Sequence, residues 1–153
     1  MDQSAVDGRA LVRAYLDDVF SRGNLSAMDR YLRGGPFMER VAELVTLWRT
    51  AFSDFHITVD EAIVEADRVV TVEIMDGTHD GVFKSRLGPI APTGTKVSWS
   101  RISIRRLDGD RFVDGFFEED EVALLFQLGA LADRAQGSKG LHSPMATDRP
   151  AND

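Results

Sequence analysis

The strongest constraint on the fold is a change in the period of the hydrophobic residues near Asp54. Before Asp54, apolar residues recur at the three- to four-residue spacing of amphipathic helices. After it, they alternate with polar residues in runs rich in Val, Ile, Thr and Phe, which is typical of strands. These runs span residues 55–64, 68–76, 81–87, 96–107 and 111–119. The connections between them are too short for parallel crossovers, so we expect an antiparallel sheet.

Helices are predicted on both sides of this sheet in the chain. The pattern predicts a long helix over 4–22, a short one containing Leu25 and Leu32, a third from Pro36 to Phe52, and a last one that Asp120 caps. Helices, then a curved sheet, then a closing helix predict an α+β fold. We expect the curved antiparallel sheet to wrap around the N-terminal helices as a cone with an internal pocket, closed by the C-terminal helix.

Composition excludes several classes of function. The 153 residues suit a single domain, expected over 1–135, and the polar segment 136–153 predicts a disordered tail. The net charge of −7, without any Lys/Arg cluster, argues against nucleic acid or membrane partners. The chain contains no Cys, which excludes disulfides and thiolate chemistry. No signal peptide or membrane span is visible, so we expect a cytoplasmic protein.

Several short motifs occur in the order that one known family shows. They are Gly77-Thr78-His79-x-Gly81-x-Phe83, Pro92-Thr93-Gly94, and Asp120-Glu121 followed by Gln127-Leu128-Gly129. With these motifs the chain resembles the SnoaL-like polyketide cyclases of the nuclear transport factor 2-like superfamily, over roughly residues 8 to 130. The resemblance implies a deep cavity, ring closure on a small polyketide-derived substrate, no cofactor, and a homodimer formed through the sheet.

The chain departs from this family at the positions of its catalytic residues. The resemblance implies a catalytic His-x-Asp pair on the strand before the last helix, but these positions are Gly115 and Phe117. A second family histidine falls at or beside Ile102. The acid/base groups of an aldol cyclase are therefore missing. An apolar cavity can still accelerate ring closure by holding a flexible substrate in a reactive fold.

Four ionisable residues are candidates for catalysis. Glu119 shares a strand face with Phe117, because strand faces alternate with a period of two. Glu73 or Asp76 is a candidate on another strand: the family alignment points Glu73 inward, whereas the apolar neighbours favour the face of Asp76. His79 lies in the glycine-rich stretch between two strands. The three histidines of the chain have no paired spacing, so no metal site is expected.

Aromatic and aliphatic side chains are candidates for the substrate-binding wall. They are Tyr15, Phe20, Trp48, Phe52, Ile102, Gly115 and Phe117. Trp99 is expected on the outer sheet surface, together with Arg101 and Arg105, where a large aromatic side chain would serve a dimer contact.

These observations lead to three hypotheses of function. The first is a cofactor-independent polyketide cyclase that closes a carbocycle by orienting its substrate, for example by cycloaddition. The second is an acid/base isomerase, an epoxide-opening cyclase or a hydrolase with relocated carboxylates. The third is a non-catalytic small-molecule binding or interaction module, because one fold can serve several functions.

Overall fold

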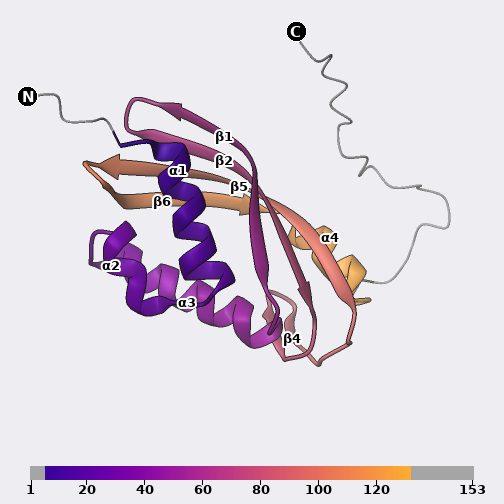
Figure 1. Cartoon of the computed structure of the whole chain (residues 1–153). Helices are drawn as coiled ribbons and strands as arrows, with labels where there is room; N and C mark the ends of the chain where they lie inside the picture. Colours follow the sequence, from indigo (N-terminus) through magenta and orange to yellow (C-terminus); the bar gives the residue numbers. More distant parts are fainter. Residues whose placement is uncertain (1–5, 132–153) are drawn as a thin grey trace, which may run out of the picture.

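A computed structural model describes residues 6–131, and they form four α-helices and a curved antiparallel sheet. The sheet curls around α1 and α3 without closing into a barrel (Figure 1). Its strand order is β1-β2-β5-β6, with a separate two-stranded hairpin β3-β4. The helices are α1 (Gly8–Tyr15), α2 (Met28–Tyr31), α3 (Pro36–Ala51) and α4 (Glu121–Gln127). The strands are β1 (His56–Glu65), β2 (Arg68–Thr78), β3 (Phe83–Ser85), β4 (Gly88–Ile90), β5 (Lys96–Asp108) and β6 (Arg111–Glu119).

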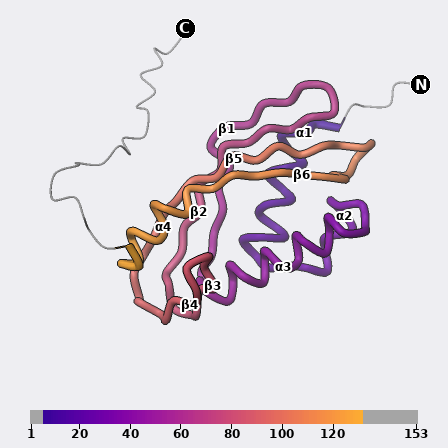
Figure 2. The backbone as a smooth tube through the Cα atoms, turned by 180° about the vertical axis from the view of Figure 1, so that it is seen from behind, coloured from indigo at the N-terminus to yellow at the C-terminus, as the bar shows by residue number. Residues whose placement is uncertain are grey.

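The helix ends follow the expected capping chemistry, with one difference at the first helix. Asp7 accepts hydrogen bonds from the backbone N–H groups of Arg9 and Ala10, and Asp120 accepts one from Ala123. The expected helix over 4–22 is α-helical only to Tyr15, because residues Leu16–Ser21 form a π-helical turn. The expected strand over 81–87 is also shorter, since the chain turns into the hairpin β3-β4, seen beside the end of α3 in Figure 2.

The concave face of the sheet carries the residues that the sequence pattern assigned to the outside. On β5 the buried side chains are Val97, Trp99, Arg101, Ser103 and Arg105. Ile102, expected in the cavity wall, is instead 55% exposed on the convex face, and Trp99 is only 3% exposed. Both expectations were wrong for the same reason. Apolar residues occupy alternate positions on both faces of β5, so alternation alone does not identify the buried face.

Trp48 anchors an aromatic core between α3 and the sheet. Its ring packs against Phe83 and Trp99, with centroid distances of 5.3 and 5.2 Å, and Phe52 lies 5.4 Å from Trp99. Trp48 and Phe52 were expected to line a substrate pocket, but they are packed in this core and are 1% and 0% exposed. Burial of this aromatic surface is a large part of what holds α3 on the sheet.

Hydrogen bonds join the turn after α3, at residues 53–54, to residues 78–80 at the end of β2. Asp54 accepts from the backbone N–H and the hydroxyl of Thr78, and Asp80 accepts from the N–H and hydroxyl of Ser53. The glycine-rich family motif therefore has a structural role here. Gly81 is required because a Cβ atom at this position would lie 1.9 Å from the carbonyl oxygen of Thr50.

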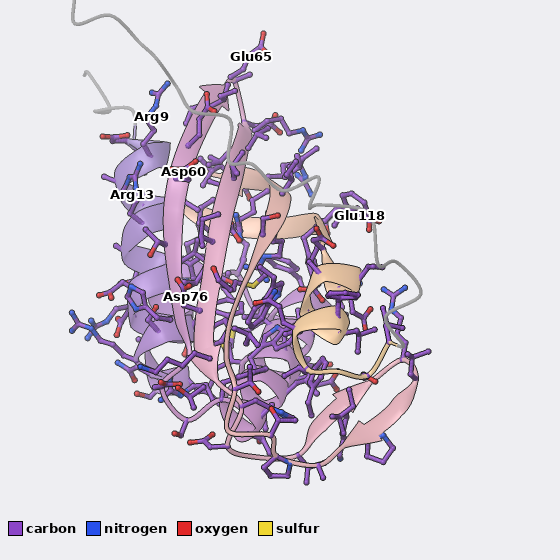
Figure 3. All side chains as sticks on the ribbon, turned by 90° about the vertical axis from the view of Figure 1, so that its right-hand side faces the viewer. Arg9, Arg13, Asp60, Glu65, Asp76 and Glu118 are labelled. Carbon is purple, nitrogen blue, oxygen red and sulfur yellow. The ribbon has the colours of Figure 1, made fainter. Side chains whose placement is uncertain are left out.

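Strand β1 forms one edge of the sheet and is partly covered by α1. Arg13 donates to the carbonyl of Val59, at 2.7 Å, and Arg9 donates to that of Ala62, at 3.2 Å (Figure 3). Val59 also stands at an irregularity in the pairing of β1 with β2. Charged side chains and such an irregularity are common ways to protect an edge strand from pairing with another chain.

Two further expectations concern membrane-spanning helices and the C-terminal segment. Among residues 6–131, no helix is long and apolar enough to cross a membrane. The whole of the expected tail over 136–153 lies outside the described residues, and the division into 1–135 and a tail stays a prediction.

We expect Gly81→Ala to destabilise the protein by about 2 kcal/mol or more, because the turn must move away from Thr50 to admit the methyl group. Gly34→Ala is the matched control, since no atom lies within 4 Å of a Cβ at that position. Equilibrium denaturation of the two variants and the parent protein measures the difference. Equal stability of the two variants would contradict the assigned role of Gly81.

Candidate functional site

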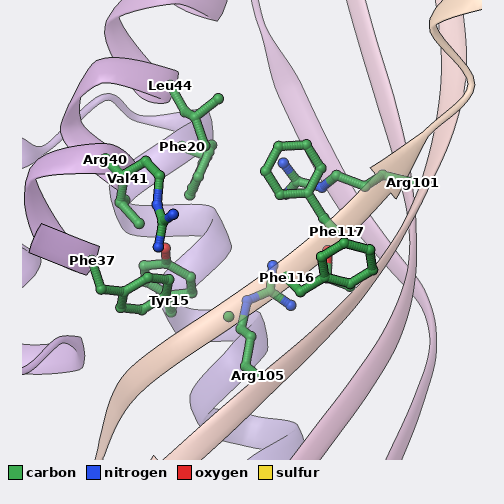
Figure 4. Close-up of a pocket in the computed structure, with 12 residues that line it drawn as sticks. Tyr15, Phe20, Phe37, Arg40, Val41, Leu44, Arg101, Arg105, Phe116 and Phe117 are labelled. Atoms are coloured by element: carbon green, nitrogen blue, oxygen red, sulfur yellow. The ribbon is translucent and has the colours of Figure 1, made fainter.

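A small cavity lies between the helices and the concave face of β5 and β6. Its volume is about 50 Å³, which is room for a few water molecules or one polar group of that size. Arg101 and Arg105 extend into it from β5, and Tyr15 and Arg40 approach from the helices opposite (Figure 4). The lining residues are Tyr15, Phe20, Phe37, Arg40, Val41, Leu44, Arg101, Ser103, Arg105, Gly115, Phe116 and Phe117.

The π-helical turn directs two aromatic rings into this cavity. Hydrogen bonds in a π-helix link residues five apart, as the bond from Arg22 N–H to the carbonyl of Asp17 illustrates. Residues five apart thereby come to lie on the same side of the helix. Tyr15 and Phe20 have this spacing, and their rings meet edge to face with a centroid distance of 5.7 Å.

Glu73 on β2 is the centre of a buried polar network beneath the cavity. One carboxylate oxygen, Oε1, accepts from Thr71 Oγ1 at 2.5 Å and lies 2.7 Å from Arg105 Nη2. The other, Oε2, accepts from Arg101 Nε at 2.7 Å and from Ser103 at 3.3 Å. Arg105 also donates from Nη1 to Thr71, at 2.8 Å. This settles one open alternative, because Glu73 faces inward and is fully buried.

Aromatic faces hold the two guanidinium groups in place. Arg101 lies between the rings of Phe20 and Phe117, with its Cζ atom 5.4 and 5.0 Å from the two centroids. Arg105 lies over the ring of Tyr15, at 5.7 Å. Cation–π contacts of this kind are favoured most where water is excluded. They cover the flat faces of the guanidiniums and leave their N–H edges for hydrogen bonding.

Burial and neighbouring charge set the protonation states of this network. Burial would raise the pKa of Glu73, but Arg105 and Arg101 outweigh it and hold the pKa at about 2. Burial raises the pKa of Tyr15 to about 12, although both arginines oppose the shift. Near neutral pH Glu73 is therefore ionised and fully engaged, and Tyr15 keeps its proton. Neither is suited to accept a proton from a substrate.

Gly115 and Phe117, the two positions that depart from the family pattern, both line the cavity, and their role in binding substrate stays a prediction. A Cβ atom at Gly115 would lie 3.1 Å from two ring atoms of Phe37. The missing side chain at 115 thus lets Phe37 pack against β6. Phe37 thereby occupies space that a side chain at 115 would take, and the cavity, at about 50 Å³, is smaller than the deep pocket that the resemblance implied.

Glu119 lies on the same strand face as Phe117 but borders a different hollow. That hollow is lined by Phe117, Glu119 and the start of α4, and its volume is about 310 Å³. Glu119 Oε2 is buried and makes no hydrogen bond of good geometry among the described residues, although the neighbouring Trp99 indole favours its charged form. Burial raises the pKa of its carboxyl group, and the charge of Arg101 opposes this effect. Arg101 pairs with Glu119 across the strands, yet the two form no ion pair within 4.0 Å.

The other two candidate acids lie elsewhere. Asp76 is on the convex side of β2, near Asp54 and Lys96. His79 is fully buried at the far end of the sheet, where its Nδ1 lies 3.0 Å from Thr93 Oγ1 and accepts from the Thr93 N–H. None of the side chains around His79 lines the cavity. The structure therefore does not bring Glu73, Asp76, His79 and Glu119 together at one point.

Sequence reasoning missed Arg101 and Arg105 as site residues. Both arginines share a strand face with Trp99, and Glu73 on another strand provides a carboxylate. Together these features could have indicated a buried ion pair. Among the described residues, no group of three or more His, Asp or Glu is placed to hold a metal ion.

Comparisons with known proteins agree with this architecture. The family model of the SnoaL-like polyketide cyclases matches residues 10–128. A search of curated proteins finds no significant match. A protein of Acidithiobacillus ferrooxidans, assigned as a polyketide cyclase, is 22% identical, with a TM-score of 0.71 over 86% of this chain and 100% of that one.

Two Streptomyces proteins have the same fold. TsrD of Streptomyces laurentii is 24% identical, with a TM-score of 0.67 over 86% of this chain and 99% of its own. AclR of Streptomyces galilaeus, assigned as a hydroxylase, is 23% identical, with a TM-score of 0.71 over 87% of each chain. Likeness at these identities shows the fold, and the different assignments illustrate that the fold alone does not fix the reaction.

We expect Glu73→Gln to destabilise the protein by about 3–5 kcal/mol near neutral pH, because two buried guanidiniums lose their counter-charge. Folding lowers the pKa of Glu73 from 4.5 to about 2, so its contribution is present above pH 4.5 and is lost as the pH falls towards 2. Over this interval the parent protein should lose about 3 kcal/mol more stability than the variant does. Glu118→Gln, at an exposed position on β6, is the matched control (Figure 3). Parallel pH profiles of the parent and Glu73→Gln would contradict the assignment.

Proposed function

We propose a reaction for this protein from the fact that its chain belongs to the SnoaL-like polyketide cyclase family. The proposed reaction is closure of a carbocycle on a polyketide-derived substrate, which the protein holds in a reactive conformation. The observation that supports this mechanism is the state of Glu73, the acid beneath the cavity. Glu73 is ionised and its oxygens are occupied by Arg101, Arg105 and two hydroxyl groups. The cavity thus offers no free base, and orientation is what remains for it to supply.

The wall of the cavity supports a role in orientation. Phe20, Phe37 and Phe117 give it flat apolar surfaces against which a conjugated chain can pack. Arg101 and Arg105 form its floor, and their N–H groups that contact neither Glu73 nor Thr71 can hold a carbonyl oxygen and withdraw electron density from the chain. The cavity volume of about 50 Å³ admits only one end of such a substrate. The rest must lie in the mouth, or Phe37 and Phe117 must rotate away.

A ring closure with little charge development, such as a cycloaddition, suits this site. Alignment of reacting ends can lower a barrier by up to about 7–11 kcal/mol without proton transfer. The second candidate is acid/base ring closure or isomerisation through Glu119. The burial of this carboxyl group and its raised pKa favour a proton donor there. Phe117 borders both hollows and is the common wall of the two candidate sites.

A metabolite comparison tests the proposed reaction. In a strain of the source organism that lacks the gene, an uncyclised isomer should accumulate with the same mass as the missing product, because ring closure of this kind is an isomerisation. Purified protein added to the extract should convert that isomer, as followed by liquid chromatography and mass spectrometry. We expect Phe20→Leu and Phe117→Leu each to slow conversion by about tenfold or to change the product stereochemistry.

Two glutamate variants separate the two mechanisms. Glu119→Gln should reduce the rate by less than about tenfold if orientation dominates, and Glu65→Gln, at an exposed position on β1 outside both hollows, should leave it unchanged. A loss of more than about 100-fold in Glu119→Gln alone would reject orientation as the main effect and support proton transfer. Absence of any conversion by the folded protein would reject both and leave a binding module.

We also propose that the protein is a homodimer formed through the convex face of the sheet. Ile102, Ile104 and Phe116 are 55, 43 and 59% exposed there, on adjacent strands β5 and β6. An apolar patch of this kind commonly marks an interface. Trp99, which we had expected in this contact, is buried on the opposite face.

We expect Ile104→Lys to convert the dimer to a monomer, because Ile104 lies between Ile102 on β5 and Phe116 on β6, and a charge there would have to be desolvated. Light scattering coupled to size-exclusion chromatography measures the mass of each species. Leu87→Lys, on the turn of the β3-β4 hairpin and 63% exposed, is the control and should leave the mass unchanged. A monomeric parent protein would overturn this assembly.

A further inference from the structure

The charges beneath the cavity do not balance. Two guanidiniums, Arg101 and Arg105, share the single carboxylate of Glu73, and all three side chains are almost completely buried. No other carboxylate among the described residues lies within 4.0 Å of either arginine. Glu119 is the nearest acid by strand pairing, but it makes no such contact. A surplus positive charge in a buried site is costly unless an anion compensates it.

Hydrogen bonding is unbalanced in the same direction. Only two nitrogens of each guanidinium meet an acceptor among the described residues: Nε and Nη2 of Arg101, and Nη1 and Nη2 of Arg105. The contact of Arg101 Nη2 with Glu73, at 2.6 Å, also lacks hydrogen-bond geometry. Arg101 Nη1 and Arg105 Nε have no protein acceptor in this part of the chain. The network therefore has donors in excess.

The remaining polar groups around the cavity are suited to donate as well. Tyr15 keeps its proton, and Arg40 points from α3 back towards Tyr15 at the mouth (Figure 4). The hydroxyl of Ser103 is already directed to Glu73. A ligand that fits this lining must bring acceptors and negative charge. Guanidiniums favour planar groups with two oxygens, because both oxygens can be bound at once.

We propose that the cavity binds a planar two-oxygen anion, the carboxylate or the 1,3-dicarbonyl enolate of its substrate, on the free N–H edges of Arg101 and Arg105. The volume of about 50 Å³ suits one such group, with the chain to which it is attached leading out past Phe37 and Phe117. Glu73 is then a positioning residue that orients both arginines. The identity of the rest of the substrate rests on the proposed function, whereas the anion preference does not.

A matched pair of ligands tests this proposal on the full-length protein. Hexa-2,4-dienoate and hexa-2,4-dienamide have the same shape and differ in charge. Isothermal titration at pH 7 should show the acid binding at least about tenfold more tightly than the amide. Arg105→Gln should abolish the preference while keeping the Glu73–Arg101 pair, which protects the fold. Arg111→Gln, an exposed arginine outside the cavity, is the control and should retain it.

Hexane-2,4-dione distinguishes the two sources of the anion. Binding as an enolate should increase the ultraviolet enolate band of the dione in the parent protein and not in Arg105→Gln. Preference for the dienoate alone identifies a carboxylate, and growth of the enolate band alone identifies a dicarbonyl substrate. Equal affinity for acid and amide with no enolate band, no binding of any probe, or equal binding by Arg105→Gln and Arg111→Gln overturns the proposal. Anion binding without conversion in the metabolite test would instead count against the cyclase function alone.

Discussion

The interaction on which the rest of the structure depends is the buried contact of Glu73 with Arg101 and Arg105. It joins β2 to β5 at the centre of the sheet, where Glu73 and Arg101 are direct cross-strand partners. A slip of one residue in this pairing would move every inward side chain of β5 to the convex face. It would also separate three charges that are stable in the interior only as a group. The network therefore fixes the register that gives the cavity its lining.

The same network limits the chemistry of the cavity. Arg101 and Arg105 keep Glu73 ionised and occupied, so an inward acid that looks catalytic in the sequence serves to hold the arginines. Phe20 and Phe117 complete this arrangement by covering the faces of Arg101. A rigid, donor-rich floor under an apolar wall can bind and polarise one end of a substrate. It has no means of removing a proton, and this distinguishes the site from a dyad of free carboxylates.

The sequence predicted the helices, the antiparallel sheet and the closing helix, because these depend on local period and on turn residues. It predicted Gly115 and Phe117 in the cavity wall through the resemblance to a family. It failed at Ile102 and Trp99, since β5 is apolar on both faces and the choice between them depends on partners from other strands. The arginines were missed for the same reason. Their burial depends on Glu73, which is 28 residues away in the chain from Arg101.

The network also couples the cavity to Glu119. Arg101 lowers the pKa of Glu119 while burial raises it, so the positive charge of Arg101 favours the ionised form of that carboxyl. An anion bound to Arg101 would offset this charge and add repulsion of its own, which shifts Glu119 towards its protonated form. Binding of a charged substrate end would thereby prepare a proton donor on the other side of Phe117. Orientation by the arginines and proton donation by Glu119 are thus compatible, since the first would create the conditions for the second.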